Sequence, residues 1–140
     1  MKKIFYILVI IIIIINLIIV KKTKVVENIS YDRDLEYFKE YFNNNDIIGK
    51  IKINDTNIND FLVKTYDNEY YLTHNLNKEY DIKGAIYVDY RTNLNSRQIN
   101  IYGHNSLLYD LPFKTLERYL DKEFYLNHKY INIWDGNKDN

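Results

Sequence analysis

The stretch from Ile4 to Val20 is an almost unbroken apolar run in which Asn16 is the only strongly polar residue. Its length of about 17 residues is at the short end of what crosses the roughly 30 Å hydrocarbon core of a bilayer as a helix. No small-residue cleavage site follows the run, which favours a retained anchor over a cleaved signal peptide. We therefore expect a transmembrane segment within residues 1–24, with a buried soluble helix or a cleaved signal as the alternatives.

Lysines flank this apolar run on both sides, so the positive-inside rule does not fix the orientation of the segment. Beyond residue 24 the chain carries 14 basic and 19 acidic side chains. That balance excludes the basic surface of a nucleic-acid-binding protein. The 140 residues contain no cysteine, which excludes a disulfide framework and a thiolate metal site within them.

The next part of the chain alternates between helix and strand patterns. Residues 32–42 carry leucine and phenylalanine at helical spacing, which predicts an amphipathic helix. Residues 47–53 alternate isoleucine with lysine, and a turn at 54–57 separates them from a short apolar run at 61–63, so we expect a β-hairpin. Residues 84–90 cluster β-branched and aromatic side chains and predict a further strand.

A short alternating run from Gln98 to Tyr102 predicts a strand that ends at Gly103 and His104. Imidazole can take up and give a proton near neutrality, and a strand end holds it rigidly, so His104 is the candidate catalytic residue. The alternative is a structural histidine that is satisfied by backbone groups. His74 and His128 show no metal-ligand spacing with it, and we predict no metal site.

The last third of the chain is expected to form a helix and one more strand. Asp110 is placed to cap a helix that has Pro112 in its first turn and leucines on roughly one side. Tyr130 to Trp134 alternates apolar and polar residues, which predicts a strand. The turn signal from Asp135 to Asn137 implies another strand, yet the sequence ends at position 140. We therefore interpret the domain as unfinished.

Five blocks of this sequence match a known family in order and spacing. They are IGKIKINDTNI at 48–58, YYLTHNL at 70–76, GAIYVDYR at 84–91, IYGHN at 101–105 and FKTLERYLDKEFYLNHKYINI at 113–133. From residue 48 to about 134 the chain thereby resembles class B sortases, the membrane-anchored cysteine transpeptidases of Gram-positive bacteria. A lone Gly-His-Asn would be a weak signal, whereas five ordered blocks are a specific one.

The sequence also departs from the family pattern. Lys50 stands where family members commonly have tryptophan, and Asn59-Asp60-Phe61 stands where they have a proline before the second strand; we interpret both as tolerable surface or packing changes. The family's nucleophilic cysteine and active-site arginine lie on two strands beyond the end of this sequence. No residue here takes either role, so the resemblance assigns only His104, as general acid/base.

The resemblance implies a mainly β (α+β) fold, a partial sortase-type β-barrel with an N-terminal helix, tethered by one N-terminal transmembrane helix. The expected domains are a signal anchor at 1–24, a spacer and amphipathic helix at 25–46, and an incomplete barrel at 47–140. Missing terminal strands would leave unpaired sheet edges, so we expect the isolated domain to be marginally stable and prone to association.

The implied function is that of a cysteine transpeptidase that attaches secreted proteins to the cell wall or to pili, here truncated or split and inactive alone. The implied partners are a sorting-signal peptide, a cell-wall or pilin amine acceptor, the membrane, and a separately encoded C-terminal half; no cofactor is expected. We expect a single-pass protein of the cell membrane with its domain outside. The alternative is a non-catalytic, membrane-anchored binding protein on a sortase-like scaffold.

Overall fold

The computed structural model describes residues 10–16, 34–106, 109 and 111–136. The chain divides into two compact units, residues 1–33 and residues 34–140. Most of the expected anchor, residues 1–24, lies outside the described residues, and residues 10–16 within it are helical. None of the helices in the described ranges combines the length and the apolar character needed to cross a bilayer.

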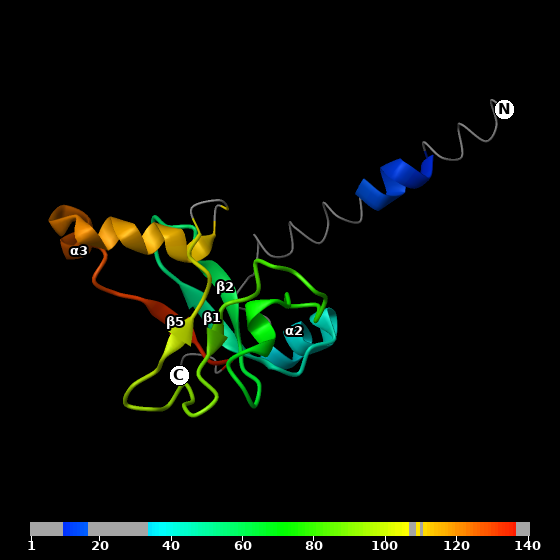
Figure 1. Ribbon diagram of the computed structural model, residues 1–140, viewed down its shortest axis with the longest axis horizontal. Helices are drawn as coiled ribbons and strands as arrows, with labels where there is room; N and C mark the ends of the chain where they lie inside the picture. The colour runs from blue at the N-terminus through cyan, green and yellow to red at the C-terminus, as the bar shows by residue number, and fades with distance from the viewer. Residues whose placement is uncertain (1–9, 17–33, 107–108, 110, 137–140) are drawn as a thin grey trace. The chain divides into compact units, whose positions relative to one another are not determined.

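The second unit is built on one open sheet of five strands, in the order β4-β3-β2-β1-β5 (Figure 1). The strands are β1 (Ile47–Lys52), β2 (Asn59–Val63), β3 (Tyr87–Val88), β4 (Ile101–Tyr102) and β5 (Asn132–Trp134). β2 pairs with β1 antiparallel, which confirms the predicted hairpin, and with β3 in parallel. β5 and β4 add antiparallel strands at the two ends, so the sheet is not closed into a barrel.

One face of the sheet is covered by the helix α2 (Leu35–Phe42), as the helical spacing predicted. The Asp34 carboxylate caps its first turn by accepting a hydrogen bond from the Tyr37 backbone N–H at 2.9 Å. Phe38 is buried and packs its ring 4.9 Å from that of Phe61 on β2. Lys50, opposite Phe61 in the ladder, is only 5% exposed, so its difference from the family pattern lies in the packed interior rather than at the surface.

The opposite face carries an aliphatic core. Leu62 follows Phe61 on β2 and therefore points to the other side of the sheet. A cluster of buried residues forms there: Ile51, Ile53, Ile58, Leu62, Ile86 and Val88. Phe113, Leu116 and Tyr119 from the 3-10 helix η2 (Pro112–Leu120) pack against this cluster. The two helices thus cover opposite faces of one sheet, which is the α+β class that the sequence predicted.

Two strands are shorter than the sequence predicts. The strand expected over residues 84–90 enters the ladder only at β3, and the run before His104 only at β4. Hydrogen bonding explains the first difference, because the Ala85 N–H donates to the Tyr71 carbonyl, 3.0 Å away in the 3-10 helix η1 (Tyr70–Leu72), instead of to a strand. The alternation of apolar and polar residues in the sequence therefore predicted longer strands than β3 and β4.

The end of the described chain contains the helix and the strand expected there. η2 has Pro112 in its first turn, as predicted, while the predicted cap Asp110 lies outside the described residues. The helix α3 (Lys122–Asn127) follows, capped by the Asp121 carboxylate, which accepts from the Phe124 N–H at 2.7 Å. β5 then returns along β1, and Gly136 adopts a φ of 91° in the predicted turn.

Candidate active site

His104 lies two residues beyond the edge strand β4, as the sequence predicted, and its side chain is half-buried. Its Nε2 atom is 2.7 Å from the carbonyl oxygen of Leu72 in η1. A carbonyl only accepts, so Nε2 carries the proton in this bond. In the neutral ring Nδ1 is then the nitrogen with a lone pair.

Close packing at Gly103 places His104 beside the start of η2. A Cβ at Gly103 would lie 3.1 Å from the ring of Phe113, so a side chain there would press against that ring. Phe113 in turn packs on the aliphatic core. The glycine that precedes the histidine therefore lets β4 and η2 approach each other.

A buried carboxylate anchors the strand that carries His104. Asp89 is fully buried and accepts hydrogen bonds from the Arg91 guanidinium at 2.6 and 2.9 Å and from the Tyr102 hydroxyl at 3.1 Å. The bonds from Arg91 hold the pKa of Asp89 well below its usual range. Because Tyr102 belongs to β4, the carboxylate ties this edge strand to the turn after β3.

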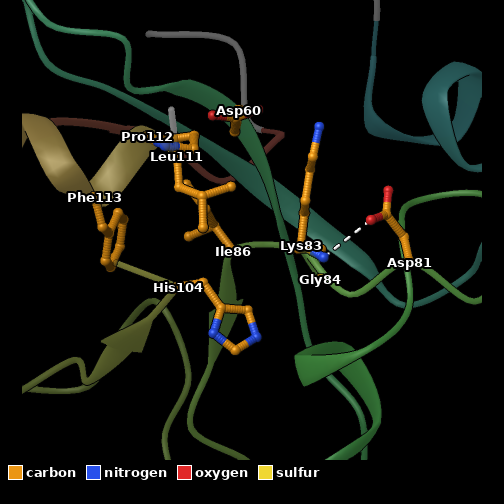
Figure 2. A pocket seen from close by; sticks show the side chains of 11 residues that line it. Asp60, Asp81, Lys83, Gly84, Ile86, His104, Leu111, Pro112 and Phe113 are labelled. Carbon is orange, nitrogen blue, oxygen red and sulfur yellow. Dashed lines mark hydrogen bonds between the residues drawn. The ribbon is translucent and has the colours of Figure 1, made fainter. Parts of the chain in front are cut away.

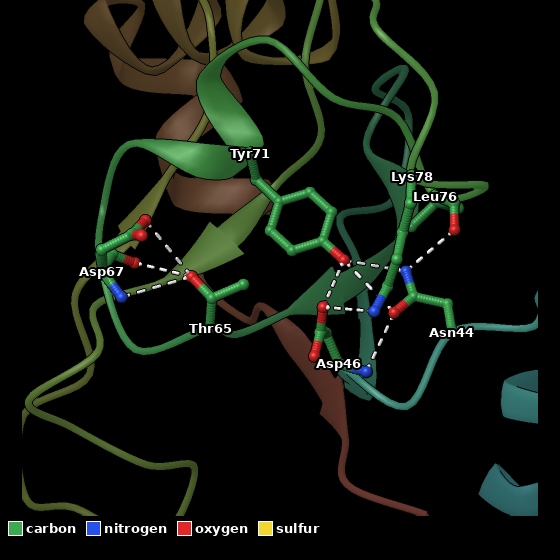
Figure 3. Close-up of polar contacts among 7 residues, drawn as sticks. All are labelled: Asn44, Asp46, Thr65, Asp67, Tyr71, Leu76 and Lys78. Carbon is green, nitrogen blue, oxygen red and sulfur yellow. Dashed lines mark hydrogen bonds and ion pairs between the residues drawn. The ribbon is translucent and has the colours of Figure 1, made fainter.

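The carbonyl that binds His104 is held by a polar network around the neighbouring Tyr71 (Figure 3). The buried Tyr71 hydroxyl donates to the Asp46 carboxylate at 2.9 Å and accepts from the Asn44 amide at 2.8 Å. Lys78 pairs with Asp46 at 3.0 Å. Burial raises the pKa of Tyr71, so its hydroxyl keeps its proton. The network fixes η1 against the corner between α2 and β1.

A cavity of about 240 Å³ opens beside His104. Figure 2 shows His104 at one end of the lining and Asp60 at the other, with Ile86 and Leu111 between them. The wall is apolar along its middle and carries polar or charged side chains at its ends and rim. The lining residues are Asp60, Asp81, Lys83, Gly84, Ala85, Ile86, Gly103, His104, Leu111, Pro112 and Phe113.

The electrostatics of this cavity centre on Asp60. Burial raises the pKa of Asp60, whereas a hydrogen bond from the Asn59 backbone and the attraction of Lys50 act in the opposite direction. Burial also lowers the pKa of Lys50, and the like charge of Lys52 adds to this effect. Burial thus removes hydration from the Asp60 carboxylate, and the Asn59 hydrogen bond and the attraction of Lys50 do not fully replace it.

The other two histidines lie outside this cavity. His74 stacks on Tyr70 with 4.1 Å between ring centroids. His128 bonds to the Phe124 carbonyl and to the Asp55 carboxylate. Within the described ranges, no group of three His, Cys, Asp or Glu side chains is placed to hold a metal ion.

Among the described residues that line the cavity, His104 is the imidazole and none is a cysteine, serine or threonine. The sequence has no cysteine, and none of the arginines in the described part of the chain lines the cavity. Sequence reasoning identified His104 but not the Leu72 carbonyl, which leaves no side-chain signal, nor the place of Asp60 in the cavity lining. The one available hint was a carboxylate directly before the apolar run at 61–63.

No family model matches the sequence. Sortase B of Listeria monocytogenes is 39% identical to this chain over 95 residues, and sortase B of Staphylococcus aureus is 35% identical over 94 residues. These segments make up 66% and 63% of this chain but 38% and 36% of the two relatives. The chain therefore spans little more than a third of the length of these curated relatives.

Solved structures give the same result. The X-ray structure of Clostridium perfringens sortase B matches with a TM-score of 0.67 at 35% identity, covering 74% of this chain and 55% of that chain. A Staphylococcus aureus sortase B–substrate complex matches with a TM-score of 0.65 at 31% identity, covering 72% of this chain and 46% of that chain.

Together with the histidine at the end of an edge strand, these matches define a sortase-type domain. The sequence relatives and the solved structures named above are all sortase B proteins. The chain belongs to the class B sortase family, which confirms the resemblance inferred from the five sequence blocks.

Proposed function

We propose that this chain supplies the histidine-bearing part of a class B sortase, a transpeptidase acting on sorting-signal peptides, and that His104 is its general acid/base. The observation that carries the proposal is the placement of His104. Its ring is oriented by the Leu72 carbonyl at 2.7 Å and lines a cavity large enough for a substrate side chain. A histidine held this way has one nitrogen for orientation and one for proton transfer.

The proposed chemistry needs three groups, of which this chain provides one. A thiolate attacks the peptide carbonyl, and an arginine stabilises the oxyanion. The His104 imidazolium gives its Nδ1 proton to the leaving amine, while its Nε2–H stays hydrogen-bonded to the Leu72 carbonyl. An incoming amine then attacks the thioester, its proton returns to Nδ1, and the thiolate is released.

The thiol and the arginine are proposed to come from outside these 140 residues, either in the continuation of the same polypeptide or in a separate chain. The absence of cysteine supports this, as does the chain's coverage of just over a third of its relatives. We infer that the 140 residues alone do not catalyse transpeptidation.

We also propose that residues 1–24 anchor the protein in the cell membrane by one span, with the domain outside. The apolar run supports the span. The resemblance to class B sortases supports the outside placement of the domain, since the flanking lysines do not fix the orientation. The donor would be a sorting-signal peptide, as the substrate complex of the Staphylococcus aureus relative suggests by analogy. The acceptor would be an amine of the cell wall or of a pilin.

Reconstitution tests the proposal. The 140-residue chain in detergent micelles is mixed with a cysteine-bearing segment that corresponds to the rest of the Listeria monocytogenes relative, and cleavage of sorting-signal peptides is followed by mass spectrometry. We expect cleavage only when both parts are present. If the chain binds the peptides and reduces cleavage by an intact sortase B, the non-catalytic binding protein replaces our proposal.

A further inference from the structure

The second residue of β2, Asp60, is an acidic group on the aliphatic face of the sheet. It pairs with Ile51 in the ladder, and Leu62 lies two positions further on, so all three side chains point to the same face. Asp60 lines the cavity beside His104 and also a neighbouring cavity of about 270 Å³. Asp60 therefore borders two cavities although the residue is half-buried.

The charge of Asp60 has no close partner in the described part of the chain, where no ion pair within 4 Å includes it. Asp81, the other carboxylate of the lining, accepts a hydrogen bond from the Lys83 backbone N–H at 2.9 Å, as Asp60 does from the Asn59 backbone. The Lys83 ammonium lies 6.0 Å from the centre of the Tyr109 ring. Asp60 differs from Asp81 in lying on the aliphatic face of the sheet, where an incoming cation would compensate its partly desolvated charge.

The space next to Asp60 suits an alkyl chain. Ile86 and Leu111 are buried apolar residues that lie between Asp60 and His104 (Figure 2). The volume of about 240 Å³ exceeds the roughly 150 Å³ of an engineered apolar cavity that admits benzene. This space is therefore large enough for a linear chain of a few methylene groups beside Ile86 and Leu111.

We propose that Asp60 is a specificity-determining residue that binds a primary alkylammonium group, with the alkyl chain lying along Ile86 and Leu111. The binding itself does not require catalysis. Its role rests on the proposed function, in which such a group belongs either to a lysine side chain of the cleaved peptide or to the amine acceptor. In either case the group that Asp60 would bind is a primary ammonium.

The test is a binding measurement on the 140-residue chain in micelles, using NMR of the Ile86 and Leu111 methyl groups. The probes are Nα-acetyl-lysine methylamide for the side chain, cadaverine for a free diamine, and Nα-acetyl-norleucine methylamide as the neutral control. We expect at least one cationic probe to bind about tenfold or more tightly than the norleucine probe, because hydrogen bonds to charged groups contribute that much. The stronger cationic probe identifies the source.

Asp60→Asn should reduce cationic binding to the norleucine level, whereas Glu40→Gln, the same change of charge on exposed α2, should leave it unchanged. Equal affinity of wild-type protein for the cationic and norleucine probes would overturn the proposal, as would undiminished binding by a folded Asp60→Asn variant. If reconstituted cleavage fails while Asp60-dependent binding persists, only the proposed function falls.

Discussion

The Nε2 atom of His104 lies 2.7 Å from the carbonyl oxygen of Leu72, which is 32 positions earlier in the chain. This bond joins the segment that follows the edge strand β4 to the 3-10 helix η1. It fixes which nitrogen of the ring carries the proton. Because the acceptor is a backbone atom, the orientation of the candidate catalytic group depends on how η1 is held.

The neutral ring of His104 should therefore be the Nε2–H tautomer. In ¹⁵N NMR of the imidazole at a pH where the ring is neutral, we expect the shift of a protonated nitrogen at Nε2 and that of an unprotonated nitrogen at Nδ1. A ring with its proton on Nδ1 would show that the bond to Leu72 does not form in solution, and would remove the basis for our proton-transfer scheme.

Gly84→Ala should disturb this anchor. Gly84 has a φ of 62°, and a Cβ there would lie 2.4 Å from the Tyr71 carbonyl oxygen and 2.8 Å from that of Leu72. The left-handed backbone alone costs an alanine about 1–2 kcal/mol. We expect at least this loss in urea unfolding, with a changed Nε2 shift of His104. Lys83→Ala, an exposed neighbour, should change neither quantity.

Tyr71→Phe tests the network that supports η1. The variant removes the hydroxyl that bonds both Asp46 and the buried Asn44 amide. Leaving buried polar groups unsatisfied should lower the free energy of unfolding by about 1–3 kcal/mol. Tyr80→Phe, at an exposed tyrosine, is the matched control and should be neutral. Equal stability of the two variants would mean that the network does not contribute.

His128 should make stability depend on pH. Its Nδ1 is 2.8 Å from the Phe124 carbonyl and its Nε2 is 2.8 Å from the Asp55 carboxylate, so both nitrogens face acceptors and the imidazolium is favoured. The bond to Asp55, followed by that to Phe124, raises the pKa of His128, while Arg118 opposes the rise. The folded state then binds this proton more tightly than the unfolded chain does.

The contribution of His128 is therefore complete below its unfolded pKa of about 6.5, and it is lost as the pH rises through the higher folded pKa. We expect the thermal midpoint to fall over that range in the wild-type chain and to vary less in Asp55→Asn. A thermal midpoint that rises over this pH range in the wild-type chain would contradict the assignment. So would an Asp55→Asn variant whose midpoint depends on pH as strongly as that of the wild type.

The sequence predicted the parts of the fold that local patterns determine. The spacing of Leu35, Phe38 and Phe42 predicted α2, and the isoleucine alternation around Ile51 predicted the first hairpin. His104 was identified because a strand end and a titratable ring coincide in sequence. These features depend on residues that are close together along the chain.

Features that depend on distant contacts were not predictable in this way. The bond between Leu72 and His104 uses a backbone oxygen, which has no residue-type signal. The parallel pairing of β2 with β3 depends on a bond from the Val63 N–H to the Ile86 carbonyl at 3.1 Å. The ladder at Tyr87 is short because the Ala85 N–H donates to the Tyr71 carbonyl instead. The role of His128 likewise depends on Asp55, which lies 73 positions away.

The most direct test of the central claim is the rate of peptide cleavage by the chain reconstituted with a cysteine-bearing segment, comparing His104→Gln with His74→Gln. His74 lies outside the cavity, so the two variants make the same chemical change at a candidate and at a control histidine. We predict that His104→Gln lowers the single-turnover rate by about 10²–10⁴-fold, the usual contribution of general acid/base catalysis, and that His74→Gln keeps the wild-type rate. A His104→Gln complex that cleaves as fast as the wild type would contradict the account.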